Sequence, residues 1–147
     1  MDLTIRRFEE RDRGEVVSLW DRCGLIVPWN NPELDIDRKV GFQPDLFLVG
    51  EAGGRVAATA MGGYEGHRGW VNYLAVDPGL RGRGFGRALM ARLESELSGL
   101  GCPKINIQVR RDNLDVMRFY ERIGYVDDDL VSLGKRLKED PPWKGGI

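Results

Sequence analysis

One segment near the middle of the chain constrains its fold more than any other: an apolar strand runs through a short turn into an amphipathic helix. Residues 70–76 predict the strand, which Pro78 ends. Apolar side chains then recur every four residues from Phe85 to Leu97, which predicts a helix that stops at Gly101. A strand joined to a helix in this way is typical of a domain that layers helices on a sheet.

The turn itself spans residues 81–87 and combines three glycines with three arginines. The first N–H groups of a helix lack partners within the helix, and the aligned peptide dipoles place about half a positive charge there. Glycine leaves these amides open to a ligand, so the turn predicts a site for phosphate or pyrophosphate. Its members are Arg81, Gly82, Arg83, Gly84, Phe85, Gly86 and Arg87.

The three arginines favour a functional role over a plain loop. A cation near a helix N-terminus is disfavoured by roughly 0.3–1 kcal/mol at exposed sites, and the first turn carries no Asp or Glu to compensate. Local rules are broken in this way at functional sites rather than structural ones. A bound polyphosphate would turn the repulsion among Arg81, Arg83 and Arg87 into attraction.

Other interpretations of the turn fit less well. The dinucleotide fingerprint GxGxxG fails because Arg87 stands where its third glycine belongs, and a Walker loop fails because no Gly-Lys-Ser/Thr is present. Arg-Gly segments that bind nucleic acid are usually unstructured, whereas this one is joined to a strand and a helix. A folded phosphate site is the interpretation that remains.

The rest of the pattern predicts one α/β domain over residues 1–137. Helices are expected after Asp12, Asn31 and Asn113, because each of these residues can cap the helix that follows. The order is β-α-α-β-β-β-α-β-α-β(β), which predicts a sheet of about six to seven strands. Besides the strand already described, strands are expected near residues 3–8, 46–49, 55–60 and 105–109, with one or two edge strands between 125 and 137. Residues 138–147 predict a polar tail that frays.

Composition narrows the function classes. The 147 residues carry 22 Lys and Arg against 23 Asp and Glu, a net charge of −1, so no global basic field is available to bind nucleic acid. A single histidine, His67, excludes a multi-histidine zinc site, and Cys23 and Cys102 form neither a disulfide framework nor a metal-binding pattern. No segment matches a signal peptide or a membrane span. We therefore expect a cytoplasmic protein without a metal, a nucleic-acid partner or a membrane partner.

The turn resembles motif A of the GNAT superfamily of acetyl-CoA-dependent N-acetyltransferases, whose pattern is Gln/Arg-x-x-Gly-x-Gly/Ala at a strand–helix junction. Residues 81–86 satisfy this pattern. A second element of the family matches in register further along, with Asn113, Tyr120 and Gly124, followed by Tyr125 where the family often has Phe. Segments 28–33, 62–69 and 132–137 are further similar to a small bacterial branch, the YpeA-type acetyltransferases.

The resemblance implies a fold and an activity. The fold would be a mixed, mostly antiparallel central sheet with helices on both faces. The activity would be acetyl transfer from acetyl-CoA directly to a primary amine in a ternary complex. Acetyl-CoA would lie where the strands at 70–76 and 105–109 separate. The resemblance implies that the turn binds its pyrophosphate and that Asn113 contacts its pantetheine arm. Backbone N–H groups of Leu74, Ala75 and Val76 would hold the pantetheine and the thioester.

Tyr120 is the candidate catalytic acid. A leaving thiol titrates near ~8.5 and a phenol near ~10, so a tyrosine can donate a hydrogen bond or a proton to the departing thiolate. The alternative is that Tyr120 only packs, since it shares a helical stripe with Val116 and Ile123. Asn113 likewise has the alternative role of a plain helix cap.

The acceptor side is less determined. The resemblance implies that the loop at residues 25–30 roofs the amine site, so Trp29 is a candidate for substrate binding or for anchoring the loop, and Tyr73 is a second candidate. Some relatives carry a Glu as general base where this chain has Gln108, which cannot take a proton. The candidates for the base are Glu65, Tyr73 through water, Glu33, Asp35 and Asp37.

The acceptor itself stays open between a protein N-terminus, a lysine side chain and a small-molecule amine. A homodimer also stays open. The alternative function is a non-catalytic module that binds or senses acyl-CoA, which the loss of the family's Glu at Gln108 favours and the presence of Tyr120 opposes.

Overall fold

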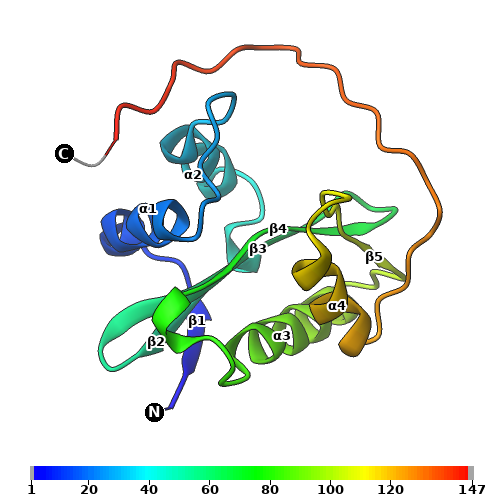
Figure 1. The fold of residues 1–147 in the computed structure, drawn as a ribbon, viewed down its shortest axis with the longest axis horizontal. Helices are drawn as coiled ribbons and strands as arrows, with labels where there is room; N and C mark the ends of the chain where they lie inside the picture. The colour runs from blue at the N-terminus through cyan, green and yellow to red at the C-terminus, as the bar shows by residue number, and fades with distance from the viewer. Residues whose placement is uncertain (1, 146–147) are drawn as a thin grey trace.

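A computed structural model describes residues 2–145 as a central sheet of five strands with helices on both faces (Figure 1). The strands lie side by side in chain order: β1 Thr4–Arg7, β2 Phe47–Ala52, β3 Arg55–Tyr64, β4 Gly69–Val76 and β5 Ile105–Asn106. Strands β1 to β4 pair antiparallel, and β5 runs parallel to β4. The mixed, mostly antiparallel α/β architecture is therefore confirmed.

Each face of the sheet buries its own hydrophobic cluster. Helices α1 Arg13–Arg22 and α2 Pro32–Val40 cover one face, where Trp20 and Phe47 lie at the centre of the cluster. Helices α3 Phe85–Gly99 and α4 Leu114–Arg122 cover the other face, and Leu93 of α3 is fully buried there. Three short 3-10 turns complete the elements: η1 Glu10–Asp12, η2 Pro44–Leu46 and η3 Pro78–Leu80.

Of the expected helix caps, Asn31 caps its helix and Asp12 does not. Asn31 caps α2 as its sequence predicts, because its side-chain oxygen accepts hydrogen bonds from the backbone N–H groups of Glu33 at 3.0 Å and Leu34 at 3.3 Å. Asp12 precedes α1 but makes no side-chain cap, so that expectation is wrong. The reason is a buried ion pair: both carboxylate oxygens of Asp12 accept from the Arg6 guanidinium at 2.8 Å.

The expected edge strands after α4 do not form, so the sheet has five strands rather than six to seven. Residues 126–145, which we name the C-terminal strap, are extended or irregular. Three consecutive acids interrupt the apolar alternation that a strand needs, and one of them, Asp129, has a φ of 55°. Strand β5 is also shorter than residues 105–109. Five apolar side chains in the first part of the strap are exposed: Val126, Leu130, Val131, Leu133 and Leu137.

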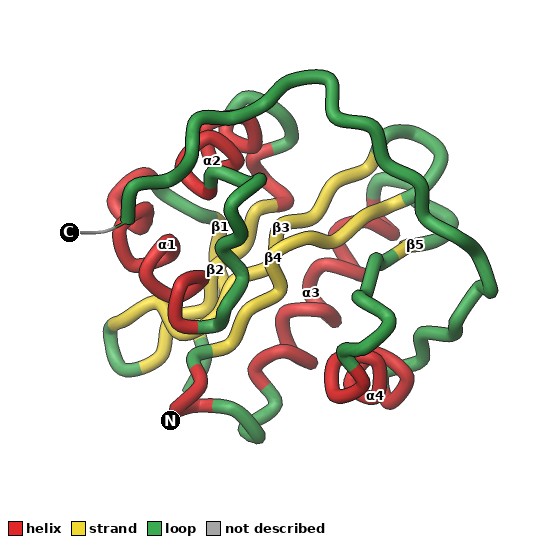
Figure 2. The backbone as a smooth tube through the Cα atoms, turned by 45° about the horizontal axis from the view of Figure 1, so that its top comes forward, coloured by secondary structure: helices red, strands yellow, loops and turns green. Residues whose placement is uncertain are grey.

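The far end of the strap is anchored rather than frayed, which corrects the expectation for residues 138–145. Figure 2 shows the strap as a loop that leaves α4, passes around the molecule and returns to α1 and α2. There Asp140 pairs with Arg38, the Asn31 side-chain amide donates to the Pro141 carbonyl at 2.8 Å, and Trp143 packs against the α1/α2 cluster. The strap therefore links the two helical layers.

Among the helices of residues 2–145, none has the length and apolar character that a bilayer crossing requires.

Candidate active site

The glycine-arginine turn presents open backbone amides at the start of α3. The first bond within the helix runs from the Ala88 N–H to the Gly84 carbonyl at 3.0 Å, which leaves the N–H groups of residues 85–87 without helical partners. Gly82 and Gly84 have φ values of 79° and 80°, and a Cβ on either would meet nothing within 4 Å. The first turn of α3 contains no acidic residue. The local geometry is that of an anion site.

The side chains of the turn divide into two groups. Arg81, Arg83 and Arg87 are exposed, and none forms an ion pair with another residue of the described chain. Phe85 is instead buried, and a Cβ on Gly86 would approach the Phe119 ring to 3.2 Å. The arginines and the glycines at 82 and 84 are thus open to solvent, whereas Phe85 and Gly86 hold α3 against the sheet and α4.

Strands β4 and β5 separate almost immediately. The structure pairs them only at Gly69 with Ile105 and at Trp70 with Asn106, within residues 2–145. From residue 71 to its end, β4 therefore has no strand of the described chain on its β5 side, so alternate backbone groups along that edge lack a strand partner. The Val76 carbonyl accepts instead from Arg81 Nε at 3.4 Å and from Cys23 Sγ at 3.3 Å. Leu74, Ala75 and Val76 lie on this open stretch, and Asp77 and η3 separate it from the glycine-arginine turn.

Tyr120 of α4 is 7% exposed and packs edge-on against Phe119 and Tyr125. Burial raises the pKa of Tyr120 to about 12, so its hydroxyl stays protonated at neutral pH. That hydroxyl forms no hydrogen bond with any other part of the described chain. The side chain is thus a neutral donor that a ligand could engage.

The cavity that Tyr120 lines does not extend to the glycine-arginine turn. Tyr120 lines a cavity of about 1090 Å³ between β5, α4 and residues 126–133 of the strap. None of the turn residues, nor Leu74 to Val76, lines this cavity. Asn113 caps α4 by accepting from the Val116 N–H at 3.3 Å, which confirms the helix-cap role and leaves its contact with pantetheine as a prediction.

Tyr73 and Trp29, the two candidates for substrate binding, each contact a residue that the sequence did not link to them. The Tyr73 hydroxyl donates to an Asp35 carboxylate oxygen at 2.6 Å, and burial together with this bond raises the pKa of Tyr73. Trp29 is half exposed in the loop before α2, and the Arg110 guanidinium lies over its ring at 5.6 Å. This contact brings the loop to the segment between β5 and α4, and its role as a roof over the amine site stays a prediction.

The remaining candidates for the general base have other partners. Glu65 accepts from the backbone N–H groups of its own turn, at His67 and Arg68. Glu33 and Asp37 both pair with Arg13. Asp35 also lies near Arg38, at 3.2 Å, but it is the acid that the structure places against Tyr73.

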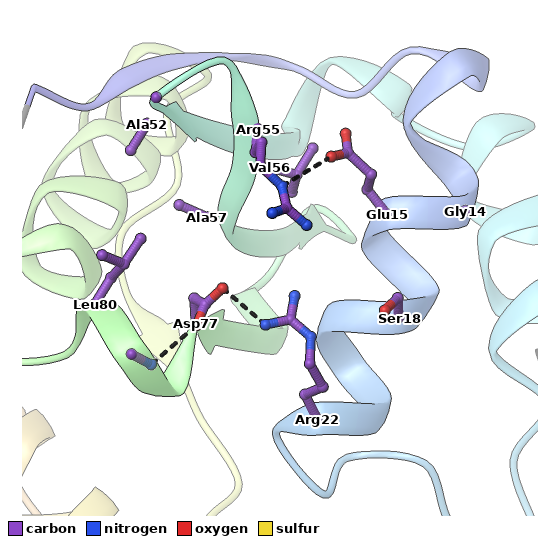
Figure 3. A pocket seen from close by; sticks show the side chains of 12 residues that line it. Gly14, Glu15, Ser18, Arg22, Ala52, Arg55, Val56, Ala57, Asp77 and Leu80 are labelled. Atoms are coloured by element: carbon purple, nitrogen blue, oxygen red, sulfur yellow. Dashed lines mark hydrogen bonds and ion pairs between the residues drawn. The ribbon is translucent and has the colours of Figure 1, made fainter.

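A separate pocket of about 440 Å³ lies between α1, the β2–β3 hairpin and residues 77–80 (Figure 3). Its charges neutralise one another, since Arg22 pairs with Asp77 at 2.7 Å and Arg55 approaches Glu15 at 4.0 Å. It therefore lacks the free positive charge of the turn. No cluster of residues in the described chain has the His, Cys, Asp or Glu donors of a metal site.

A buried polar residue of β3, which the sequence pattern did not mark as functional, contacts the backbone of β4. Thr59 is fully buried in β3, and its hydroxyl donates to the Tyr73 carbonyl at 2.8 Å. The sequence held one clue, a lone hydroxyl in an otherwise apolar strand, but its partners lie 14 and 39 residues away.

Comparisons with known proteins agree with this geometry. A family model described as "Acetyltransferase (GNAT) family" matches residues 12–125. "Acetyltransferase YE1169" of Yersinia enterocolitica is 51% identical over 141 residues, which cover 96% of this chain and 100% of that protein. The family match ends at residue 125, where the strap begins.

Two solved structures are similar at 25% identity. Ard1 from Thermoplasma volcanium has a TM-score of 0.73, with 86% of this chain and 84% of that chain covered. The ribosomal-protein-S18-alanine N-acetyltransferase from Escherichia coli has a TM-score of 0.70, with 84% and 77% covered. With its glycine-arginine turn set at the open edge of β4, this chain belongs to the GNAT family and is an acetyl-CoA-dependent acetyltransferase.

Proposed function

We propose that this protein transfers the acetyl group of acetyl-CoA directly to a primary amine within a ternary complex in the cytoplasm. The observation that carries the proposal is that two features lie close together along the chain. One is the turn at residues 81–87, with amides that lack helical partners and arginines that form no ion pair within the described residues; the other is the edge of β4 a few residues earlier, which has no strand partner there beyond Trp70. One feature suits a pyrophosphate and the other an extended pantetheine arm with its thioester. Acetyl-CoA supplies an activated acyl group and a thiolate leaving group.

In the proposed complex, the turn binds the charged end of the co-substrate. The amides of residues 85–87 donate to phosphate oxygens, while Arg81, Arg83 and Arg87 neutralise their charge. The open edge of β4 donates to the pantetheine amides and to the thioester carbonyl through residues 74–76. Removal of one such donor to a developing oxyanion typically costs about 10²–10³ in rate.

Tyr120 stabilises the leaving group by donating a hydrogen bond. With a pKa of about 12, complete proton transfer from Tyr120 to a thiolate of pKa ~8.5 would be uphill by roughly 5 kcal/mol. Hydrogen-bond donation needs no such transfer and strengthens as negative charge grows on sulfur. In the structure Tyr120 lines the cavity next to β5, so this role requires the pantetheine arm to extend from the edge of β4 toward α4.

The acceptor enters from the α1/α2 side, under the loop that carries Trp29. A primary amine with a pKa near ~10.4 must lose a proton before it attacks the thioester. Asp35 is the carboxylate that would take this proton through water, because Tyr73 holds it in place with a hydrogen bond of 2.6 Å. Gln108 does not serve, since its amide cannot accept the proton and donates to Ser132 of the strap.

The decisive experiment is a panel of amines with acetyl-CoA, read by release of free thiol. The panel contains lysine peptides, amino acids, polyamines, aminoglycosides and peptides with a free α-amino group, the last because the similar Escherichia coli structure is named for an alanine of ribosomal protein S18. Thiol release that depends on one amine class supports the proposal. Tight binding of acetyl-CoA without thiol release across the panel would instead establish a non-catalytic acyl-CoA-binding module.

A further inference from the structure

Strand β4 contains a bulge immediately before the residues assigned to the thioester. Met61 pairs with Asn72 and Thr59 pairs with Ala75, so two steps along β3 face three steps along β4. The extra residue places Tyr73 at a φ of 51°, in the left-handed region. That region costs a non-glycine residue on the order of 1 kcal/mol or more, so neighbouring contacts must hold the backbone there.

The contact that holds it is a buried chain of two hydrogen bonds. Trp20 Nε1 donates to Thr59 Oγ1 at 2.9 Å, and Thr59 Oγ1 donates to the Tyr73 carbonyl at 2.8 Å. An indole nitrogen only donates, so the hydroxyl proton of Thr59 has to point at the carbonyl. Trp20 and Thr59 are both fully buried, and the Trp20 ring stacks on the Tyr73 ring at 3.8 Å between centroids.

This chain of bonds also determines where the next amide points. The carbonyl of Tyr73 and the N–H of Leu74 belong to the same peptide plane, and in a trans peptide they point in opposite directions. Because Thr59 holds the carbonyl toward β3 and α1, the Leu74 N–H is directed away from them. The edge of β4 on that side carries no strand beyond Trp70, within the described residues.

We propose that Thr59, oriented by Trp20, is a positioning residue that aims the Leu74 N–H at the acetyl carbonyl of acetyl-CoA. This inference rests on the proposed binding of the thioester along β4. Thr59 touches neither substrate nor thioester; it acts through the peptide plane between Tyr73 and Leu74. A displaced donor would weaken the bond to the carbonyl and raise the barrier to the tetrahedral intermediate.

The test compares Thr59→Val, which has nearly the same shape but no hydroxyl, with Thr59→Ser, which keeps the hydroxyl. The readout is the infrared stretch of acetyl-CoA labelled with ¹³C at the thioester carbonyl, which shifts to lower frequency when the oxygen accepts a hydrogen bond. We expect the bound-state shift to be largely lost in Thr59→Val and restored in Thr59→Ser. Where an acceptor has been found, single-turnover rates should fall about 10- to 100-fold and recover in the same order.

Controls separate this role from general stability and from the proposed function. Val16→Ala removes buried volume from the same α1 cluster but keeps the side chains of Trp20 and Thr59 that form the hydrogen-bond chain, so it should lower the melting temperature and leave the carbonyl shift intact. Trp20→Phe keeps a stacking ring but removes the N–H, and it provides a second test if Thr59→Val does not fold. Plain CoA should bind the Thr59 variants and wild type within about twofold, since its pyrophosphate site is unaltered.

The outcomes are distinct. A folded Thr59→Val or Trp20→Phe protein with the wild-type carbonyl shift would overturn the positioning role of Thr59. A shift lost equally in Val16→Ala would also overturn it, because loss of stability would then be the cause. A wild-type protein that shifts the carbonyl but acetylates no amine would contradict the proposed transferase function and leave the role of Thr59 standing.

Discussion

Replacement of Gly84 by Asp tests the pyrophosphate site with a charge that the structure can accommodate. A Cβ at Gly84 would meet nothing within 4 Å, and Asp enters the left-handed region, here at a φ of 80°, more readily than most residues. The strain of about 1 kcal/mol is offset by roughly 0.3–1 kcal/mol, because a carboxylate at the cap of α3 complements the helix dipole. The melting temperature should therefore change by about 4 °C or less.

The affinity for CoA should change much more. A carboxylate about 5 Å from the two charges of a pyrophosphate would be repelled by about 1.7 kcal/mol even at the dielectric constant of water, which corresponds to more than tenfold in the dissociation constant. Isothermal titration calorimetry with CoA measures the loss. Gly84→Asn, which keeps the shape without the charge, should lose far less, and the gap between the two variants should narrow at high ionic strength.

Gly54 offers a matched control for this substitution. It lies in the β2–β3 hairpin with a φ of 75° and open space around its missing Cβ, so Gly54→Asp reproduces the backbone strain and the added charge outside residues 81–87. CoA affinity should be unchanged in Gly54→Asp. A folded Gly84→Asp protein with wild-type affinity for CoA would refute the assignment of the turn as the pyrophosphate site.

Three further substitutions address the leaving group, the acceptor and the core. Tyr120→Phe should slow single-turnover acetyl transfer by about 10²–10³-fold with little change in melting temperature, because its hydroxyl bonds to nothing else in the described chain; a wild-type rate would make Tyr120 a packing residue. Trp29→Ala should raise the acceptor KM or lower kcat, and an equal loss of CoA affinity by calorimetry would contradict its place on the acceptor side. Burial lowers the pKa of Lys39 to about 8 from 10.5, so the folded protein holds fewer protons than the unfolded one between these values and stability rises with pH across that window. Lys39→Met should flatten this rise in urea titrations and add up to about 3 kcal/mol at pH 7, and an unchanged pH profile would show that the ammonium is solvated in the folded state.

Local patterns predicted the parts of the molecule whose causes are local. The glycine-arginine turn, the cap at Asn31 and the apolar ladder of α3 depend on neighbours a few residues away, and the structure places all three as expected. The role of Asp12 was wrong because its partner Arg6 comes from β1, and the helix-capping pattern carries no information about that contact. Pairing between distant segments is the information that a single sequence lacks.

The candidate site shows the same division. The glycine-arginine turn, our candidate phosphate site, is a continuous segment, so its sequence contains nearly all of its geometry. The proposed acceptor side is assembled from α2, β4 and the loop at Trp29, and the pairing of Asp35 with Tyr73 spans 38 residues. The one or two edge strands expected between residues 125 and 137 do not form, because a strand needs a partner edge as well as apolar residues, and β5 pairs with β4 through only two of the described residues.

The anchoring of the strap has a consequence for how the protein folds. Asn31 caps α2 with its side-chain oxygen and binds Pro141 with its side-chain nitrogen, across a separation of 110 residues. Closing so long a loop costs conformational entropy once. The ion pair of Asp140 and the packing of Trp143 then form at the same anchor point without a second loop-closure cost. The α1/α2 layer, on the proposed acceptor side, is therefore completed by residues that the ribosome adds long after it has made α2. A nascent chain can form the glycine-arginine turn early, but it completes the α1/α2 layer only when this late segment arrives.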